Sequence, residues 1–141
     1  LATDYSATST ATTQPTVIGV TAGRSTLYNQ EYGSNADGSA ISSYITTADM
    51  ALGESNDSMF VKRYIPDFQN QTGSVNMQFL VRQYPGSSQT VASSTLVYST
   101  TTKVDMRARG RQVAIKMVSS DVDSTFRFGT IRIDTQPDGL R

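Results

Sequence analysis

The sequence predicts an all-β fold: an antiparallel β-sandwich, jelly-roll-like or immunoglobulin-like, that follows an extended N-terminal arm rich in Ser and Thr. After position 58 the chain contains about six short strand-like runs, roughly ten residues apart and separated by turn residues. This spacing favours an antiparallel sandwich over a parallel α/β fold. Ser and Thr account for 37 of the 141 residues and charged residues for 17%, which suits strands and polar loops better than long helices. No helical period continues over three turns.

The first 16 residues, LATDYSATSTATTQPT, contain eight Ser or Thr and one Pro. They offer little apolar surface for burial, so we expect an extended arm or linker over residues 1–16. Residues 17–141 are then expected to form a single β-sandwich domain, with the best-defined strands between residues 59 and 134.

The region before Met59 contains only weak strand signals. Thr16–Val20 and Ser43–Thr47 are short strand candidates. The stretch Asn29–Ala40 is rich in Gly, Asn, Asp and Ser and is expected to be a loop.

From Met59 onward the strand signals are stronger. Met59–Ile65 is expected to be a strand that Pro66 ends, because proline cannot donate to a β-ladder. Gln69–Gly73 has the composition of a turn, and Thr95–Ser99 is a short strand candidate. Strict alternation with polar residues gives the strongest strand signal of the chain, at Val75, Met77, Phe79 and Val81.

Two further runs alternate in the same way, one before Gly110 and one after it. Their apolar positions are Val104, Met106, Ala108, Val113, Ile115 and Met117. Phe126 and Phe128 then share one face, whereas the two isoleucines that follow have the opposite parity. A β-bulge at Gly129 would restore the register. The last six residues, QPDGLR, are expected to form a turn and a terminus.

The core is expected at the apolar positions that alternate with polar partners. These are Phe60, Val75, Met77, Phe79, Val81, Met106, Val113, Ile115, Met117, Phe126 and Phe128. Met59 is the alternative to Phe60, and the expected bulge would displace Phe128.

The net charge is zero, but the charges are unevenly distributed along the chain. Residues 1–57 contain one cation and six acids, and residues 58–141 contain eleven cations and six acids. An acidic half beside a basic half suggests self-association or contact with other subunits. It argues less for a uniformly basic nucleic-acid-binding protein.

The composition excludes the most common types of catalytic and cofactor site. There is no His and no Cys, so Ser–His, Cys–His, disulfide and imidazole–zinc sites are absent. No Gly-rich loop precedes a helix, so a phosphate cradle has no support. The acids are mostly Asp beside Gly, Ser or Asn, which is typical of solvated turns rather than of a glycosidase pair. We therefore expect no enzyme activity and no cofactor.

No apolar run approaches the length of a membrane span, and the first residues show no signal-peptide pattern. Asp121 and Asp123, in SSDVDST, resemble part of a calcium loop. The segment lacks the spaced Asp or Asn positions, the Gly and the distant Glu of such a loop. A plain turn between two strands is therefore the favoured interpretation.

Arg107, Arg109 and Arg111 are the candidate site residues. In a strand that continues through Gly110 they would project from one face, opposite Met106. They could bind phosphates, pair bidentately with carboxylates of the acidic half or of a neighbouring subunit, or form a solvated face. Carboxylate pairing is favoured, because the Arg fork matches a carboxylate and no aromatic residues are interleaved as in nucleic-acid-binding strands. We expect these arginines at a subunit interface.

The tyrosines raise the possibility of a sugar-binding platform, because aromatic rings stack on sugars. They lie in unrelated segments, and the chain has no Trp. Interface or half-buried strand positions are the favoured use for Tyr28, Tyr32, Tyr44, Tyr64, Tyr84 and Tyr98.

Three stretches carry a resemblance to a known group of proteins. ADMALGESNDSMFVKRYIPDF (Ala48–Phe68) has a D-x-x-L-G region, an apolar strand and Ile-Pro-Asp-Phe. GSVNMQFLVRQYPG (Gly73–Gly86) and RARGRQVAIKMVSSDVDSTFRFGTIRIDTQPDGLR (Arg107–Arg141) follow. In their order and spacing, these stretches resemble tail-nozzle, tail-tube or DNA-stabilisation virion proteins of tailed phages, particularly short-tailed ones.

The resemblance covers the chain from about Tyr44 to its end. It implies a β-sandwich module at the C-terminus of a larger tail protein that assembles in a ring. It also implies a place in the phage tail and other virion proteins as partners. None of the three stretches is a catalytic motif, and no ligand residues are carried over.

The sequence is compatible with three functions from different classes. A virion structural protein that acts through subunit contacts is favoured. A receptor- or glycan-binding module, such as a fibre tip, would need an exposed aromatic cluster in a concave site. An enzyme such as a cell-wall hydrolase would need two convergent carboxylates in a cleft. Contact with nucleic acid through the Arg-rich strand is a weaker alternative.

Overall fold

The computed structural model describes residues 18–20, 27–29, 33–53 and 57–140. The chain divides into two compact units, residues 1–33 and residues 34–141. In the first unit, β1 (Ile18–Val20) pairs with β2 (Leu27–Asn29) in a short antiparallel hairpin. The expected arm over residues 1–16 lies outside the described residues. The expected single domain over residues 17–141 stays a prediction, and among the described residues β1 pairs only with β2.

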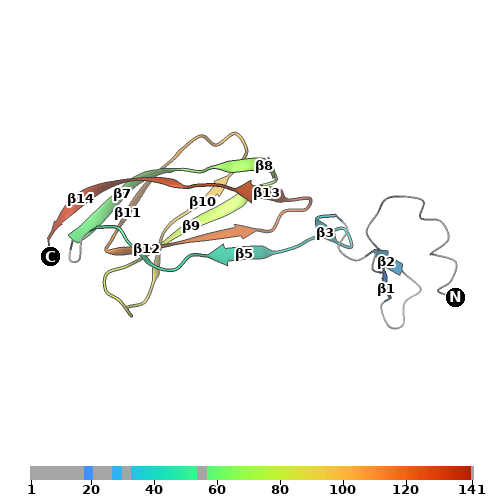
Figure 1. Ribbon diagram of the computed structural model, residues 1–141, viewed down its shortest axis with the longest axis horizontal. Helices are drawn as coiled ribbons and strands as arrows, with labels where there is room; N and C mark the ends of the chain where they lie inside the picture. Colours follow the sequence, from blue (N-terminus) through green and yellow to red (C-terminus); the bar gives the residue numbers. More distant parts are fainter. Residues whose placement is uncertain (1–17, 21–26, 30–32, 54–56, 141) are drawn as a thin grey trace. The chain divides into compact units, whose positions relative to one another are not determined.

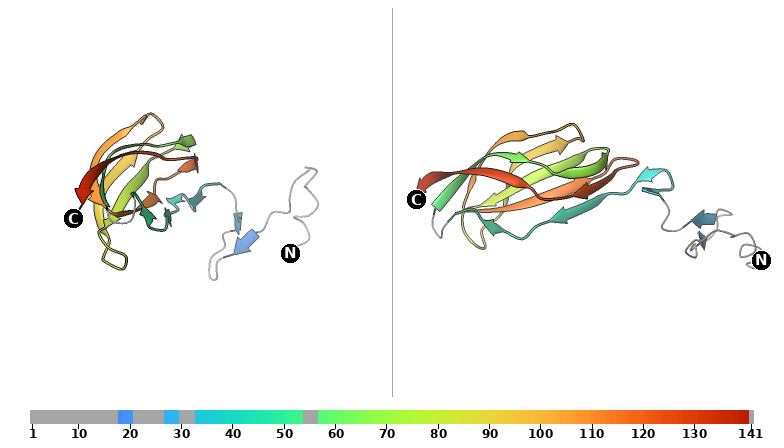
Figure 2. Two further views of the ribbon diagram at one scale, coloured as in Figure 1. Left: turned by 60° about the vertical axis from the view of Figure 1, so that its left-hand side comes forward. Right: turned by 45° about the horizontal axis from the view of Figure 1, so that its top comes forward.

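The second unit is built on two antiparallel sheets. The strands are β5 (Ser43–Thr46), β6 (Met50–Ala51), β7 (Asp57–Ile65), β9 (Val75–Arg82), β10 (Thr90–Val97), β11 (Val104–Gly110), β12 (Gln112–Ser119) and β14 (Arg132–Leu140). The five-stranded sheet has the order β10–β9–β12–β5, and β6 also pairs with β12. The three-stranded sheet has the order β11–β7–β14. Figures 1 and 2 show the two sheets as facing layers.

The predicted all-β class is confirmed. No helix occurs among the described residues, and every strand pairing that the structure describes is antiparallel. The predicted strands at Met59–Ile65, Val75–Val81 and Ser43–Thr47 correspond to β7, β9 and β5. β7 ends at Ile65, directly before the proline, as expected.

Two predicted turns are wrong because they are strands. β8 (Phe68–Thr72) replaces the turn expected at Gln69–Gly73, and it pairs with β13 (Thr125–Phe128). Its side chains are mostly polar and lie near the end of the fold, so apolar alternation does not reveal it. Likewise the C-terminal QPDGLR contains the last residues of β14, which pairs with β7 from Arg132 to Leu140 with register shifts after Asp134 and after Pro137.

Two further elements differ from the expectation in detail. The loop predicted at Asn29–Ala40 contains the hairpin of β3 (Asn35–Ala36) and β4 (Ser39–Ala40). Its turn uses two positive φ angles, at Asp37 and Gly38, which Asp and Gly tolerate best. The strand predicted at Thr95–Ser99 begins five residues earlier, at Thr90, where Ser and Thr replace apolar residues.

β13 ends directly before Gly129, the position at which a bulge was expected. The interruption extends through Ile131, so β13 and β14 are separate strands. Gly129 donates its backbone N–H to the Asp67 carbonyl at 2.8 Å. A Cβ at this position would collide with the Asp67 carboxylate, so a larger residue here would require that side chain to move.

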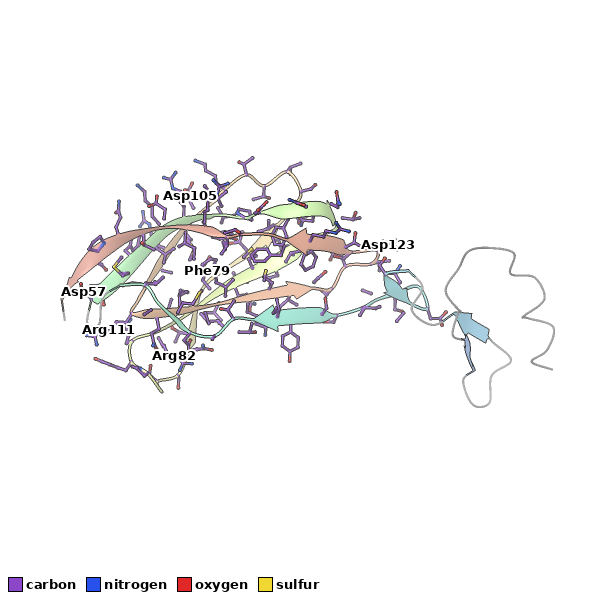
Figure 3. All side chains as sticks on the ribbon, viewed as in Figure 1. Asp57, Phe79, Arg82, Asp105, Arg111 and Asp123 are labelled. Atoms are coloured by element: carbon purple, nitrogen blue, oxygen red, sulfur yellow. The ribbon has the colours of Figure 1, made fainter. Side chains whose placement is uncertain are left out.

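The core lies between the two sheets, and the predictions on β9, β11 and β12 are confirmed. The buried cluster contains Val61, Tyr64, Val75, Met77, Phe79, Val81, Val97, Met106, Ala108, Val113, Ile115 and Met117. β9 alternates strictly between buried and half-buried residues along its length. Figure 3 shows Phe79 between the layers.

Two core predictions are wrong. Phe60 is half-buried and lies outside the buried cluster, and Phe128 is 37% exposed. Phe126 is half-buried and packs against the cluster from its margin. The two β13 phenylalanines instead contact Phe68 on β8, with ring centroids 5.5 and 5.3 Å away.

A change of register on β7 explains the error at Phe60. The pairings of β7 with β14 and with β11 both shift beside Lys62, which is the signature of a β-bulge. Val61 and Tyr64 therefore both face the core, and Arg63 faces outward. Tyr64 packs on Phe79 with ring centroids 4.8 Å apart.

Burial raises the pKa of Tyr64 from its ordinary value of 10.0 to about 12, while the nearby Thr95 side chain acts weakly in the opposite direction. The phenol oxygen makes no hydrogen bond with the described residues. Between pH 10 and 12 the unfolded chain loses this proton and the folded chain keeps it, so stability falls as the pH rises.

We predict that the free energy of unfolding decreases by about 2 kcal/mol between these two pH values because of Tyr64 alone. Tyr64→Phe should remove this part of the decrease. It should also cost little at pH 7, because the lost hydroxyl is unpaired. Denaturant unfolding at several pH values in this range measures the change in the free energy of unfolding. Tyr98→Phe, which changes an exposed tyrosine, is the control. Equal pH slopes for wild type and Tyr64→Phe would contradict the prediction.

Candidate functional site

The candidate site is the charged outer face of the three-stranded sheet. On β11, Met106 and Ala108 are buried at 7% and 1% exposure, whereas Arg107 and Arg109 are exposed. The predicted opposition of the arginines to the core residues is therefore correct for these two. Figure 3 shows Asp105 of the same strand on this outer side.

Arg111 does not continue the row of arginines. β11 ends at Gly110, and Arg111 lies in the tight turn before β12. Its guanidinium carbon lies 5.3 Å from the centroid of the Tyr84 ring, a cation–π distance. The expected stripe of three arginines on one strand face is therefore reduced to two, with the third turned toward the β9–β10 loop.

Arg109 has a carboxylate partner in its own chain. It forms an ion pair with Asp138 on β14 and donates an Nη hydrogen to the Asp138 carbonyl at 3.2 Å. The two side chains are 44% and 35% exposed, respectively, so solvent screens the pair. Arg109 thus ties the two outer strands across β7.

Arg63 makes a second cross-strand link that the sequence did not reveal. Its Nε lies 3.6 Å from an Asp105 oxygen on β11 and 3.5 Å from an Asp134 oxygen on β14. Both aspartates are register partners of Arg63. One cation therefore stands between two carboxylates on three adjacent strands.

A concavity of about 750 Å³ opens on this outer face. Its lining residues are Phe60, Lys62, Arg63, Asp105, Met106 and Arg107. Three of them are cations and one is an acid, and Lys62 and Arg107 form no ion pair with the described residues. Phe60 and Met106 are its two apolar lining residues, and the cations beside them suit an acidic, partly apolar partner.

A smaller hollow of about 200 Å³ lies beyond it, lined by Ser58, Gln83, Tyr84, Arg109 and Arg111. The structure therefore divides the three candidate arginines between two neighbouring depressions. Arg107 lines the larger hollow, and the other two line the smaller one.

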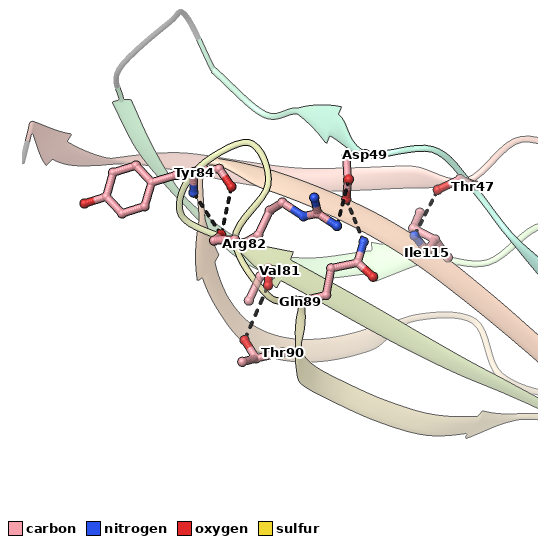
Figure 4. Close-up of polar contacts among 9 residues, drawn as sticks. Thr47, Asp49, Val81, Arg82, Tyr84, Gln89, Thr90 and Ile115 are labelled. Atoms are coloured by element: carbon pink, nitrogen blue, oxygen red, sulfur yellow. Dashed lines mark hydrogen bonds and ion pairs between the residues drawn. The ribbon is translucent and has the colours of Figure 1, made fainter.

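The acidic and basic halves of the sequence meet inside one unit. Asp49 accepts a hydrogen bond from Gln89 at 2.7 Å and forms an ion pair with Arg82 at 3.1 Å, as Figure 4 shows. Nearby, Thr47 exchanges two hydrogen bonds with the Ile115 backbone. Unit 34–141 holds 11 of the 12 basic and 10 of the 12 acidic residues, a net charge of +1. The charge asymmetry along the sequence therefore does not separate two oppositely charged bodies.

Asp121 and Asp123 hold loops together. Asp121 accepts hydrogen bonds from the backbone N–H and the hydroxyl of Ser74, at 2.6 and 2.7 Å, which lower the pKa of its carboxyl group. Asp123 has a positive φ and exchanges two hydrogen bonds with the Asn35 side chain. Among the residues that the structure describes, no group of three or more potential metal ligands occurs.

The exposed tyrosines are dispersed over the second unit. Tyr44 lies on β5, Tyr84 follows β9, and Tyr98 follows β10. None of them contacts another aromatic ring among the described residues. In the described part of the chain, no helix is long and apolar enough to cross a membrane.

No protein-family model matches the chain, and a search of curated proteins finds no match.

The geometry of Arg109 leads to a first prediction for the site. Arg109→Ala should lower the free energy of unfolding by no more than about 1 kcal/mol, because its pair with Asp138 is exposed. Urea unfolding measures this change, and Asp138→Ala should give a similar value. A loss of several kcal/mol would show that the outer face holds the fold together rather than being free for a partner.

Proposed function

We propose that this chain is a non-catalytic structural module of a virion, with a sequence pattern that resembles tail components of tailed phages. It acts through contacts with other subunits, in a homo-oligomeric ring and with other virion proteins. The observation that carries the proposal is the cation-rich concavity on the outer face of the three-stranded sheet. The resemblance of residues 44–141 to phage tail proteins supports the location in the tail.

The composition of the concavity supports a protein partner. Arginines around an apolar centre are typical of the energetically important parts of protein interfaces. Phe60 and Met106 are the apolar lining residues, and Arg107 forms no ion pair with the described residues. A carboxylate of a neighbouring subunit would complete its bidentate pairing.

The same face is less suited to nucleic acid. Asp105, Asp134 and Asp138 stand among its cations, bound to Arg63 and Arg109. A phosphate backbone would meet these carboxylates at close range, and like charges repel. Nucleic-acid-binding sheets also stack bases on exposed aromatic residues, whereas the one ring that lines the concavity, Phe60, is half-buried.

Arg107→Ala tests the proposal. We expect it to weaken assembly of the full chain roughly tenfold at low salt and to leave its unfolding midpoint unchanged. The effect should vanish at about 1 M salt, where the Debye length is about 3 Å. Native mass spectrometry and sedimentation velocity measure the assembly.

The matched control is Arg127→Ala, which removes an exposed cation from β13, outside the lining of the concavity. This variant should assemble like the wild type. Unchanged assembly of Arg107→Ala, combined with steeply salt-dependent DNA binding that this variant loses, would replace the subunit contact with a phosphate-binding face.

A further inference from the structure

β5 forms an edge of the five-stranded sheet. It pairs with β12 in unbroken register from Ser43 to Thr46, and Figure 1 shows it at the margin of the fold. Among the described residues, no other segment hydrogen-bonds the far side of β5. An edge of this kind presents unpaired N–H and C=O groups to a further strand.

The other edges carry features that discourage strand addition. β14 contains Arg132, Asp134 and Pro137, and β11 exposes Arg107 and Arg109. β10 has a register irregularity between Val91 and Ser93 and lies against β11 of the other sheet. Charges, proline and bulges all block edge-to-edge pairing.

The β5 edge has none of these features. The stretch from Ile41 to Thr47, ISSYITT, contains no charged residue, Pro or Gly, and its register with β12 shows no bulge. The strand itself offers no charge to a docking strand, so an uncharged partner strand suits it best.

Large apolar side chains are exposed on both faces of β5. Ile45 is the register partner of the buried Met117 and so faces the core side, yet it is 58% exposed. Met50 on β6, opposite the buried Val113, is 39% exposed. Tyr44, on the outer face, is 73% exposed. The core side of the sandwich is thus incompletely covered along this edge.

We propose that β5 pairs antiparallel with β5 of a second copy of this chain. The edge is neutral and apolar, so it is complementary to itself, and a twofold axis would place Ile45 of each copy beside β5 of the other. Such an isologous contact uses both open edges and closes at the dimer. The two five-stranded sheets would become one continuous sheet.

The hydrogen-bond pattern identifies the backbone groups involved. Thr47 donates its backbone N–H to the Ile115 carbonyl on β12 at 2.9 Å. Because N–H groups alternate in direction along an antiparallel strand, those of Tyr44 and Thr46 point away from β12. These two donors are available to the second copy, and their removal breaks no hydrogen bond within the sheet.

Thr46→Pro and Thr46→Lys therefore test the dimer without removing a hydrogen bond from the sheet. We expect wild type to be a dimer by sedimentation velocity of the full chain, and each variant to raise the dimer dissociation constant roughly tenfold or more. Thr46→Lys leaves the backbone intact, so it keeps the test valid if the proline variant fails to fold. Ser94→Lys places the same charge on an exposed position of β10 and should dimerise normally.

Dimerisation of wild type that persists at about 1 M salt and is lost in Thr46→Lys supports the proposal, because the edge is uncharged. A wild type that stays monomeric at all concentrations overturns it, as does dimerisation that Ser94→Lys abolishes and Thr46→Lys leaves intact. The proposal is independent of the charged face. Salt-sensitive assembly that depends on Arg107, with no effect of Thr46, would support the charged face and reject the edge.

Discussion

The pairing of β9 with β12 is the constraint on which the fold depends. The two strands run in unbroken register from Arg82 opposite Gln112 to Asn76 opposite Val118. This register places the apolar pairs side by side on one face: Val81 with Val113, Phe79 with Ile115 and Met77 with Met117. The chain is only 37% hydrophobic, so a shift by one residue would move most of the available core to solvent.

The three-stranded sheet completes this core, and the bulge on β7 adapts it to do so. β7 must place Tyr64 on Phe79 while its other residues remain paired with two neighbours. The extra residue at Lys62 changes the parity of the strand between Val61 and Tyr64. Because Tyr64 and Val61 both face the core, Arg63 faces outward and lies between two aspartates. The packing of the core thus determines the position of this cation.

Sequence reasoning succeeded where the alternation was regular. β9, β11 and β12 have period two, so their buried faces and the outward direction of Arg107 and Arg109 followed from the sequence. It failed at β7, because a bulge leaves no mark in residue type, and at β8, because a mostly polar strand has no apolar period. Arg111 was misplaced because a strand that continued through Gly110 was assumed, whereas the chain turns there.

The remaining features of the site depend on strand order, which residue patterns do not specify. The link of Arg63 to Asp105 and Asp134 joins positions 42 and 71 residues away along the chain, counting from 63 to 105 and to 134. It exists because β7 lies between β11 and β14. The neutral edge at β5 is likewise visible only once β5 is known to end its sheet.

Protection of the sheet edges explains some of the charged residues on the outer face. It does not explain the charges on the central strand. β11 and β14 end the three-stranded sheet, so their charged residues prevent unwanted pairing whatever else they do. β7 is the central strand and has no edge to protect. Of its two cations, Arg63 is held between carboxylates, whereas Lys62 forms no ion pair with the described residues. Lys62 and Arg107 line the same concavity, and neither forms an ion pair with the described residues. The proposed subunit contact would use these two charges, whereas a solvated face would leave them to water.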